Sequence, residues 1–229
     1  MSEPSIIVVT GTGTGVGKTQ LAVALVRALA ARGPVIGWKP VETGVDGAIG
    51  DDEALLAAVS AAHAPALRLP QPLSPHLAAR RAGVVIDPVA LHGRWLTLAT
   101  EWPTVVVELA GGLCSPLDDE LDNAAWLAAA PPAIRAGLRL VLVAPDRLGV
   151  LHDVAAALHA AAAHRLTIDA IALAPPRVAD ASTGTNADEL AARAPARGRP
   201  IITLPSAAPA DLATSAAMQS LLAALAPRG

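Results

Sequence analysis

A glycine-rich segment near the N-terminus has the residue types and the spacing that phosphate binding needs. Residues 11–19 read Gly-Thr-Gly-Thr-Gly-Val-Gly-Lys-Thr. Glycines allow backbone N–H groups to close around phosphate oxygens, because no Cβ atom stands in the way. Lys18 would add a positive charge at the β- and γ-phosphates, and the Thr19 hydroxyl would be a magnesium ligand. The segment therefore predicts a site for a nucleoside triphosphate.

The flanking sequence decides whether these glycines form a phosphate-binding loop or only a tight turn. The apolar run Ile6–Val9 predicts a buried strand before the loop, and residues 18–31 predict a helix that ends at Gly33-Pro34. This strand–loop–helix context favours phosphate binding over chance glycines. The spacing is unusual, because five residues separate Gly11 from Gly17, one more than in the common phosphate loop.

Two charged residues end predicted strands. Lys39 ends the strand predicted over 35–39, and Glu108 ends the strand predicted over 104–108. In open parallel sheets, ligands bind beyond the carboxyl ends of the strands. We therefore expect Lys39 to neutralise charge on a transferring phosphoryl group and Glu108 to be a second magnesium ligand. A surface lysine that merely follows a strand is the plainer alternative for Lys39.

The residues alone leave the second metal ligand open. Asp146 follows the strand predicted over 138–144, and Asp51 and Asp52 begin a predicted helix. Spacing does not separate these acids from Glu108. A helix-capping role is an equal alternative for Asp51.

Strands alternate with helices along the whole chain. Further strands are predicted over 138–144, 168–174 and 201–204, and further helices over 51–62, 87–100 and 151–164, from about 188, and near 212–225. Asp87 and Pro88 would begin the helix over 87–100 as its cap and its first residue, while the proline-rich segment 65–76 is expected to be a loop. The alternation predicts an α/β fold with a mostly parallel sheet and helices on both faces, in a single domain spanning 1–229.

The composition argues against several other classes of protein. The chain has 229 residues, a formal net charge of -3, no basic run, and four tryptophans as its only aromatic residues, which argues against a nucleic-acid-binding surface. The single cysteine, Cys114, excludes an intrachain disulfide and is expected to be a small buried side chain. No apolar run reaches the roughly 18 residues of a membrane span, and no basic segment with a cleavage site begins the chain. We therefore expect a cytoplasmic protein without a membrane or nucleic-acid partner.

Five short motifs, in this order, resemble those of the dethiobiotin synthetase family. They are the lengthened loop 11–19, Lys39-Pro40-Val41-x-Thr43-Gly44, Asp51-Asp52, Ser74-Pro75-His76 and Glu108-x-Ala110-Gly111-Gly112. The resemblance extends over nearly the whole chain and implies a P-loop NTPase-like fold and a homodimer of one-domain subunits. It also implies that 7,8-diaminononanoate, CO2 and ATP are converted to dethiobiotin, ADP and phosphate, with Mg²⁺ as the cofactor.

The resemblance implies roles for individual residues. Lys39 and Lys18 would be catalytic, and Thr19, Asp52 and Glu108 would hold Mg²⁺. The residues implied in binding the diamine substrate are Thr14, Thr43, Val150, Leu151 and His152. The residues implied in nucleotide binding are Gly15, Val16, Gly17, Lys18, Thr19, Gln20, Asp52, Glu108, Leu109, Ala110, Gly111, Pro175, Pro176, Pro205, Ser206 and Ala207.

Three positions depart from the family's pattern. Leu109 stands where a glycine usually follows the acid, which adds bulk close to the phosphate site. Pro175 stands where many members have an asparagine that contacts adenine, and His152-Asp153 replaces Asn-His in a segment that helps to hold the substrate carboxylate across the dimer. We therefore expect intact phosphoryl-transfer residues and altered contacts to the base and the carboxylate.

Two other functions fit the same residues less well. Regulatory or partitioning P-loop ATPases usually carry an extra lysine early in the loop, where this chain has Thr12-Gly13-Thr14. A diverged ligase acting on another amine or carboxylate would keep the phosphoryl-transfer site and differ at Leu109, Asp153 and Pro175.

Overall fold

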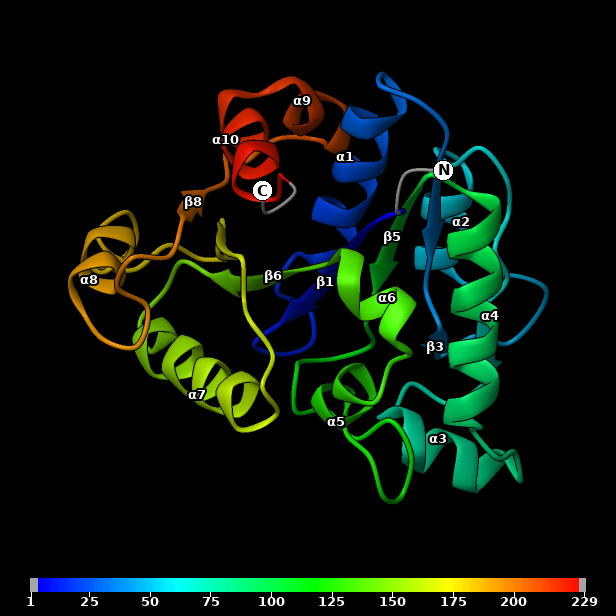
Figure 1. Ribbon diagram of the computed structural model, residues 1–229. Helices are drawn as coiled ribbons and strands as arrows, with labels where there is room; N and C mark the ends of the chain where they lie inside the picture. The colour runs from blue at the N-terminus through cyan, green and yellow to red at the C-terminus, as the bar shows by residue number, and fades with distance from the viewer. Residues whose placement is uncertain (1–3, 227–229) are drawn as a thin grey trace.

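A six-stranded parallel sheet lies at the centre of the computed structural model, which describes residues 4–226 (Figure 1). Its strands, in chain order, are β1 Ser5–Gly11, β2 Val35–Trp38, β5 Thr104–Glu108, β6 Leu138–Pro145, β7 Ala170–Ala174 and β8 Ile201–Thr203. They lie in the order β2-β5-β1-β6-β7-β8, and every neighbouring pair is parallel. All carboxyl ends therefore meet at one edge of the sheet.

The central strands are buried on both faces because successive side chains enter different hydrophobic clusters. In β1, Ile6 and Val8 pack into one cluster, and Ile7 and Val9 pack into the other. All four side chains are at most 2% exposed. A run of β-branched residues suits this position, since helices cover both faces of a parallel sheet.

Helices form a layer on each face of the sheet. One layer contains α1 Lys18–Ala30, α2 Asp51–Ala57, α9 Pro209–Thr214 and α10 Ala216–Ala224. The other contains α3 Pro75–Ala82, α4 Pro88–Glu101, α5 Asn123–Ala128, α6 Pro132–Gly137, α7 Val150–Ala163 and α8 Asn186–Ala192. Figure 1 shows α1, α9 and α10 together above the sheet and α5 and α7 below it.

The predicted fold class is confirmed, and the first difference concerns the segment 65–76. This segment was expected to be a loop, but it contains β4 Leu67–Leu69, which pairs in parallel with β3 Val41–Thr43 in a separate two-stranded sheet. It also contains the first residues of α3. The signal for α3 was Ser74-Pro75, because proline is favoured at the first helical position after a capping residue.

The second difference concerns helix ends. The helix expected over 51–62 ends at Ala57, and the short helices α5 and α6 were not predicted. The helix expected near 212–225 is two helices. Ser215 separates them, because its backbone is extended and its Oγ accepts a hydrogen bond from Met218 N at 3.1 Å, which caps α10.

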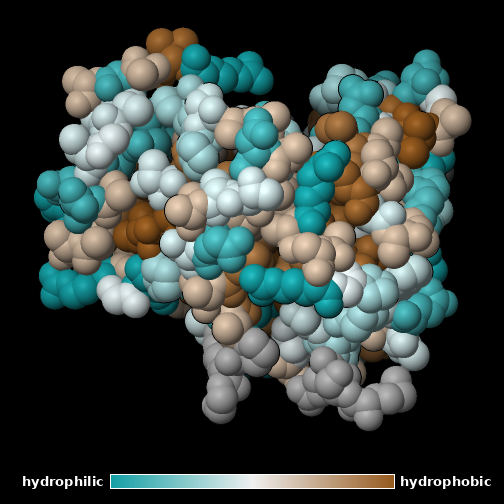
Figure 2. All heavy atoms as spheres, turned by 90° about the horizontal axis from the view of Figure 1, so that it is seen from above, coloured by the Kyte–Doolittle hydropathy of each residue, from teal (hydrophilic) through white to brown (hydrophobic). Residues whose placement is uncertain are grey.

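The face of the molecule on the α1, α9 and α10 side mixes polar and apolar residues (Figure 2). Figure 2 views the molecule from above, on the side where α1, α9 and α10 lie in Figure 1, and the hydrophobic residues there form separate patches between polar ones. Within residues 4–226, every helix is too short or too polar to cross a membrane.

Candidate active site

Strand register brings Lys39 beside Glu108. β2 and β5 are adjacent, and Trp38 is paired with Val107, so the next residues along the chain reach the same level at the carboxyl edge. Trp38 and Val107 pack in the cluster on the α4 side. Because side chains alternate along a strand, Lys39 and Glu108 face the opposite side, where α1 begins.

Four elements meet around the Lys39 ammonium. Lys39 Nζ donates to Glu108 Oε1 at 2.9 Å and also to Asp52 Oδ2. Thr19 Oγ1, in the first turn of α1, donates to the same Glu108 oxygen at 2.7 Å. Lys39 is only 6% exposed, so it is not a surface lysine. We call Thr19, Lys39, Asp52 and Glu108 the Lys39 group.

Glu42, which sequence reasoning missed, fixes Asp52 in this group. The Glu42 carboxylate is 5% exposed and accepts from Asp52 N and Glu53 N, each at 2.9 Å. It thereby caps the start of α2 from β3. A Cβ on Gly50 would overlap this carboxylate, so glycine at this position lets Glu42 approach the start of the helix. The only signal in the sequence is the absence of a capping side chain at Gly50 before Asp51.

The glycine-rich loop lies between β1 and α1, as predicted. Lys18 Nζ donates to Gly13 O at 2.7 Å, across the loop. Gly112, after β5, packs directly on the loop, because a Cβ there would lie 3.0 Å from Gly11 O and 3.1 Å from backbone atoms of Thr12 and Gly13. Gly112 therefore lets the segment after β5 rest against the phosphate loop.

Two further residues that sequence reasoning missed hold this segment in place. Asn123, 2% exposed, donates from Nδ2 to Ala110 O and to Gly112 O, each at 2.8 Å. Ser115 Oγ accepts from Gly112 N at 2.7 Å. Neither residue lies in a recognisable motif, so only the folded chain identifies them.

Burial sets the charge states in the Lys39 group. Glu108 is 1% exposed, and burial raises its pKa while Lys39 acts against that shift. Burial disfavours the Lys39 ammonium, but Glu108 and Asp52 outweigh it and hold the pKa of Lys39 above its ordinary value. Burial also lowers the pKa of Lys18 to about 8, although Glu108 acts to raise it. The site therefore holds Lys39 as a cation between two carboxylates.

The oxygen donors of the Lys39 group fit Mg²⁺. Glu108 Oε2 is buried without a hydrogen-bond partner among the described residues, although buried carboxylate oxygens are nearly always paired. The Thr19 hydroxyl and the Asp52 carboxylate offer further oxygen atoms in the same hydrogen-bonded set. Within residues 4–226, no site is formed by three or more His, Cys, Asp or Glu side chains, so a metal held by protein side chains alone is not indicated there. Mg²⁺ suits such a site, since it usually takes one or two carboxylates and completes its shell with phosphate and water.

The other candidate acids lie outside this group. Asp146 Oδ1 accepts from Asn186 Nδ2 at 2.7 Å, and its Oδ2 accepts from Gly184 N at 2.8 Å. Asp146 therefore connects the end of β6 to the start of α8. Asp51 is exposed in the first turn of α2, where the helix dipole favours an acid.

The remaining predicted nucleotide residues lie along the carboxyl edge of the sheet. Pro175 and Pro176 follow β7, and 205–207 follow β8. Gln20 is exposed in the first turn of α1. These segments are placed where a ligand at the sheet edge could reach them.

The predicted substrate residues are spread more widely. Thr14 is exposed in the loop, and Thr43 ends β3. α7 begins at Val150, whose side chain is completely buried, while His152 is exposed. No hydrogen bond joins residues 150–152 to the Lys39 group in the described chain.

Two expectations about the segment after β5 were wrong. Leu109 adds no bulk to the phosphate site, because its side chain is 2% exposed in the core and its N–H donates to Val9 O at 3.0 Å. Cys114, expected to be buried, is exposed. The turn directs Leu113 into the core instead, at 1% exposure.

Fold and site together define a P-loop nucleotide-binding protein, with a phosphate loop between β1 and α1 and the Lys39 group beside it. A family model described as "AAA domain" matches residues 5–203. The ATP-dependent dethiobiotin synthetase BioD of Nitrosospira multiformis is 39% identical over 166 residues, which cover 70% of this chain and 71% of that protein. The chain belongs to the dethiobiotin synthetase family.

Solved structures of low identity share the fold. Chloroplast FtsY from Physcomitrella patens superposes with a TM-score of 0.60 at 17% identity, over 99% of this chain and 66% of that one. A ParA family ATPase from Chlorobium tepidum TLS has a TM-score of 0.55 at 16% identity, over 98% of this chain and 91% of that one. At these identities the likeness concerns the fold alone, a single α/β domain of the P-loop type.

Proposed function

We propose that this chain closes the ureido ring of dethiobiotin from 7,8-diaminononanoate and CO2, with release of ADP and phosphate from ATP. The observation that carries the proposal is the Lys39 group, in which an ammonium is fixed between Glu108 and Asp52 and linked through Glu108 to Thr19. Family membership supplies the substrates, since the relative from N. multiformis is named for ATP-dependent dethiobiotin synthesis.

The reaction consists of an activation and a ring closure. One amine of the diamine adds to CO2 and loses a proton, which gives a carbamate. A carbamate oxygen attacks the γ-phosphorus of ATP, ADP leaves, and a carbamic–phosphoric anhydride forms. The second amine then attacks the carbonyl carbon and loses a proton, phosphate leaves with the electrons of the C–O bond, and the ring closes.

Negative charge in this sequence collects on the transferring phosphoryl group and on the carbamate. Lys39 would stabilise both, because its two carboxylate partners keep it cationic and fixed. Lys18 and the backbone N–H groups of the loop would neutralise the β- and γ-phosphates. Groups that are already in position need little reorganisation in the transition state, and in phosphoryl transfer such positioning does most of the catalysis.

Thr19, Asp52 and Glu108 would hold Mg²⁺, and the unpartnered Glu108 Oε2 supports this assignment. When bound, the ion would neutralise charge on the β- and γ-phosphate oxygens. The loop residues 15–20, the segment 108–111, Pro175-Pro176 and 205–207 would surround the rest of the nucleotide.

A second subunit would complete the binding site for the diamine substrate. We propose a cytoplasmic homodimer, as the family resemblance implies, in which Thr14 and Thr43 contact the diamine and residues 150–152 reach the partner's site. Asp153 would repel the substrate carboxylate, but Arg147 Nη2 lies 3.5 Å from Asp153 Oδ2 and balances part of its charge.

The test is ATP-dependent incorporation of ¹⁴C-bicarbonate into acid-stable product by the purified chain. Label should appear only when diaminononanoate, ATP and Mg²⁺ are all present, and the product should co-migrate with dethiobiotin. Absence of label with ATP, GTP and CTP, in protein that is folded, would refute the assignment. Hydrolysis of ATP that responds to DNA or a protein partner but not to the diamine would instead favour a partitioning ATPase. Nucleotide binding without diamine binding would favour a ligase for another amine.

A further inference from the structure

Arg177 lies against the phosphate loop although no motif marks it. β7 ends at Ala174, and a Cβ on Gly17 would lie 3.1 Å from Ala174 Cβ, so the end of this strand touches the loop. Three residues later, Arg177 Nη2 lies 3.8 Å from the position of a Cβ on Gly15. One end of the guanidinium therefore lies beside Gly15, on the β7 side of the loop.

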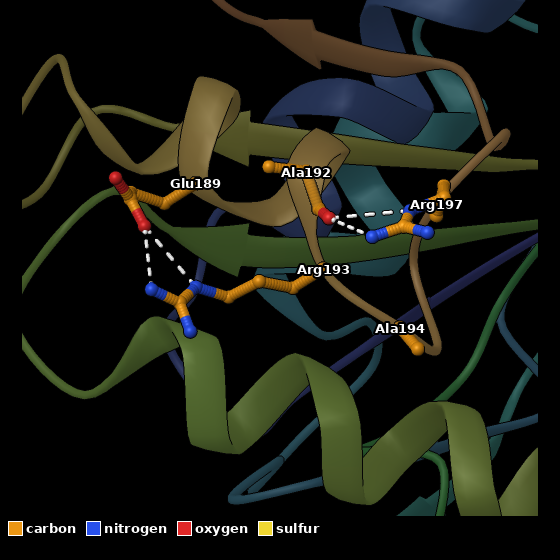
Figure 3. A pocket seen from close by; sticks show the side chains of 5 residues that line it. All are labelled: Glu189, Ala192, Arg193, Ala194 and Arg197. Carbon is orange, nitrogen blue, oxygen red and sulfur yellow. Dashed lines mark hydrogen bonds and ion pairs between the residues drawn. The ribbon is translucent and has the colours of Figure 1, made fainter.

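The Arg177 side chain is exposed and has no hydrogen-bond or ion-pair partner among residues 4–226. Two arginines just after α8 differ in this respect. Figure 3 shows Arg193 paired with Glu189, with Nη2 to Oε2 at 3.0 Å, and Arg197 donating from Nη2 to Ala192 O at 2.6 Å. Arg177 thus keeps all five of its donors free beside an anion-binding loop.

The neighbouring residues leave Arg177 as the only side-chain donor of its segment. Residues 174–178 read Ala-Pro-Pro-Arg-Val, and the two prolines have neither a backbone N–H nor a polar side chain. Any hydrogen bond that residues 175–178 donate to a ligand on the loop must therefore come from the Arg177 side chain or from the backbone N–H of Arg177 or Val178.

The charge balance of the site calls for a further cation. The charged side chains of the phosphate loop and the Lys39 group are the cations Lys18 and Lys39 and the anions Asp52 and Glu108, which cancel. A nucleoside triphosphate brings several negative charges, of which Mg²⁺ neutralises only part. A guanidinium matches phosphate geometry with parallel N–H donors.

We propose that Arg177 binds the polyphosphate chain of the nucleotide and closes the phosphate loop from the β7 side. The inference rests on the proposed nucleotide site, but it is independent of which amine the enzyme uses. In this arrangement the segment after β7 contributes a phosphate-binding side chain. Arg177 is not expected to contact the base.

Isothermal titration of ATP, GTP and inorganic tripolyphosphate into the full chain tests this inference. Arg177→Ala should weaken all three by about 10-fold or more, by a similar factor for each, since a charge-assisted hydrogen bond to phosphate is lost. Arg177→Lys should recover part of the affinity, because it keeps the charge but not the fork. Arg193→Ala is the matched control and should leave all three affinities unchanged.

Two results would overturn the inference. One is unchanged affinity in Arg177→Ala for all three ligands. The other is a loss that depends on the base and is absent for tripolyphosphate, which would make Arg177 a base-stacking residue. Ring closure is measured separately on the same variants. Wild-type protein that binds these ligands but makes no dethiobiotin would refute the proposed function and leave the binding result valid.

Discussion

At the scale of single residues, both lysines of the chain lie in one site. Lys18 and Lys39 are the only two lysines in 229 residues, and all other cationic side chains are arginine or histidine. Both are 6% exposed, and they lie on the phosphate loop and in the Lys39 group. An ammonium is a compact charge with three donors, so each lysine can bind a phosphate oxygen while it keeps its contacts within the site.

Lys39→Ala should reduce kcat for ring closure by about 100- to 1000-fold, the usual loss when one positioned donor for transition-state charge is removed. Nucleotide affinity should change little, because Lys18 and the loop remain. Radiolabel incorporation and titration calorimetry measure the two effects. Arg27→Ala, on the exposed side of α1, should retain full activity.

Loss of Lys39 also leaves Glu108 buried without its cation, so the variant needs a control for stability. Lys39→Ala combined with Glu108→Gln removes both charges and should recover part of the melting temperature without recovering turnover. Full turnover in Lys39→Ala would show that Lys39 is not catalytic.

At the scale of elements, a contact from β3 fixes the start of α2 and thereby positions Asp52. Glu42 from β3 accepts the first free N–H groups of the helix, and Gly50 allows its carboxylate to approach. The helix has no capping side chain of its own. The geometry of the Lys39 group therefore depends on the packing of β3 against α2.

A double-mutant cycle at Glu42 and Gly50 should show strong coupling. Gly50→Ala should destabilise the fold and lower kcat, because its Cβ would displace the Glu42 carboxylate and thus Asp52. Glu42→Ala should cost about 1 kcal/mol, as for other lost helix caps, and it should remove most of the additional penalty of Gly50→Ala. Urea unfolding and kcat are the readouts, and additive effects would contradict the arrangement.

The cap of α4 follows a local rule and gives a simpler prediction. Asp87 Oδ1 accepts from Val89 N at 2.9 Å and from Ala90 N at 3.1 Å, as its position before Pro88 predicts. Asp87→Ala should therefore destabilise the protein by about 1 kcal/mol, a drop of about 2–4 °C in melting temperature for a chain of this size. Glu101→Ala, at the other end of α4, should not lower the melting temperature, because an acid at a helix C-terminus opposes the dipole.

At the scale of the whole molecule, the hydrophobic cluster on the α4 side contains a stack of rings. His92 stacks on Trp126 with centroids 4.9 Å apart, and Trp126 stacks on Trp95 at 5.2 Å. His92 Nε2 donates to Trp126 O at 3.0 Å. Because this stack joins α4 to α5, the protonation state of one histidine affects the stability of the domain.

Burial lowers the pKa of His92 below its ordinary value near 6.5, although the hydrogen bond to Trp126 O acts to raise it. The unfolded chain therefore binds this proton more readily than the folded chain. The stabilising contribution is complete above pH 6.5 and is lost as the pH falls below that value. Urea midpoints at pH 7.5, 6.0 and 5.0 should decline in wild-type protein and decline less in His92→Phe. His159→Phe, at an exposed position, should follow the wild type.

Local sequence determined much of this protein. The loop 11–19 with its flanking strand and helix, the cap at Asp87, and the β-branched runs of the central strands depend on backbone conformation and on burial of neighbouring residues. Such effects act over a few residues, so they can be identified without the fold. The placement of Lys39 and Glu108 at strand ends was also sufficient to expect them on one edge of a parallel sheet.

The tertiary structure decided which of these residues meet. β5 lies between β1 and β2, and only that order and its register bring Glu108, rather than Asp146, to Lys39. Glu42 and Asn123 carry no motif, because their hydrogen-bond partners are at least ten residues away in the sequence. Arg177 is found only because β7 ends beside the phosphate loop. Strand order, register and such contacts depend on how the helices bury both faces of the sheet. Residues from the entire chain take part in that burial, so no short segment determines it.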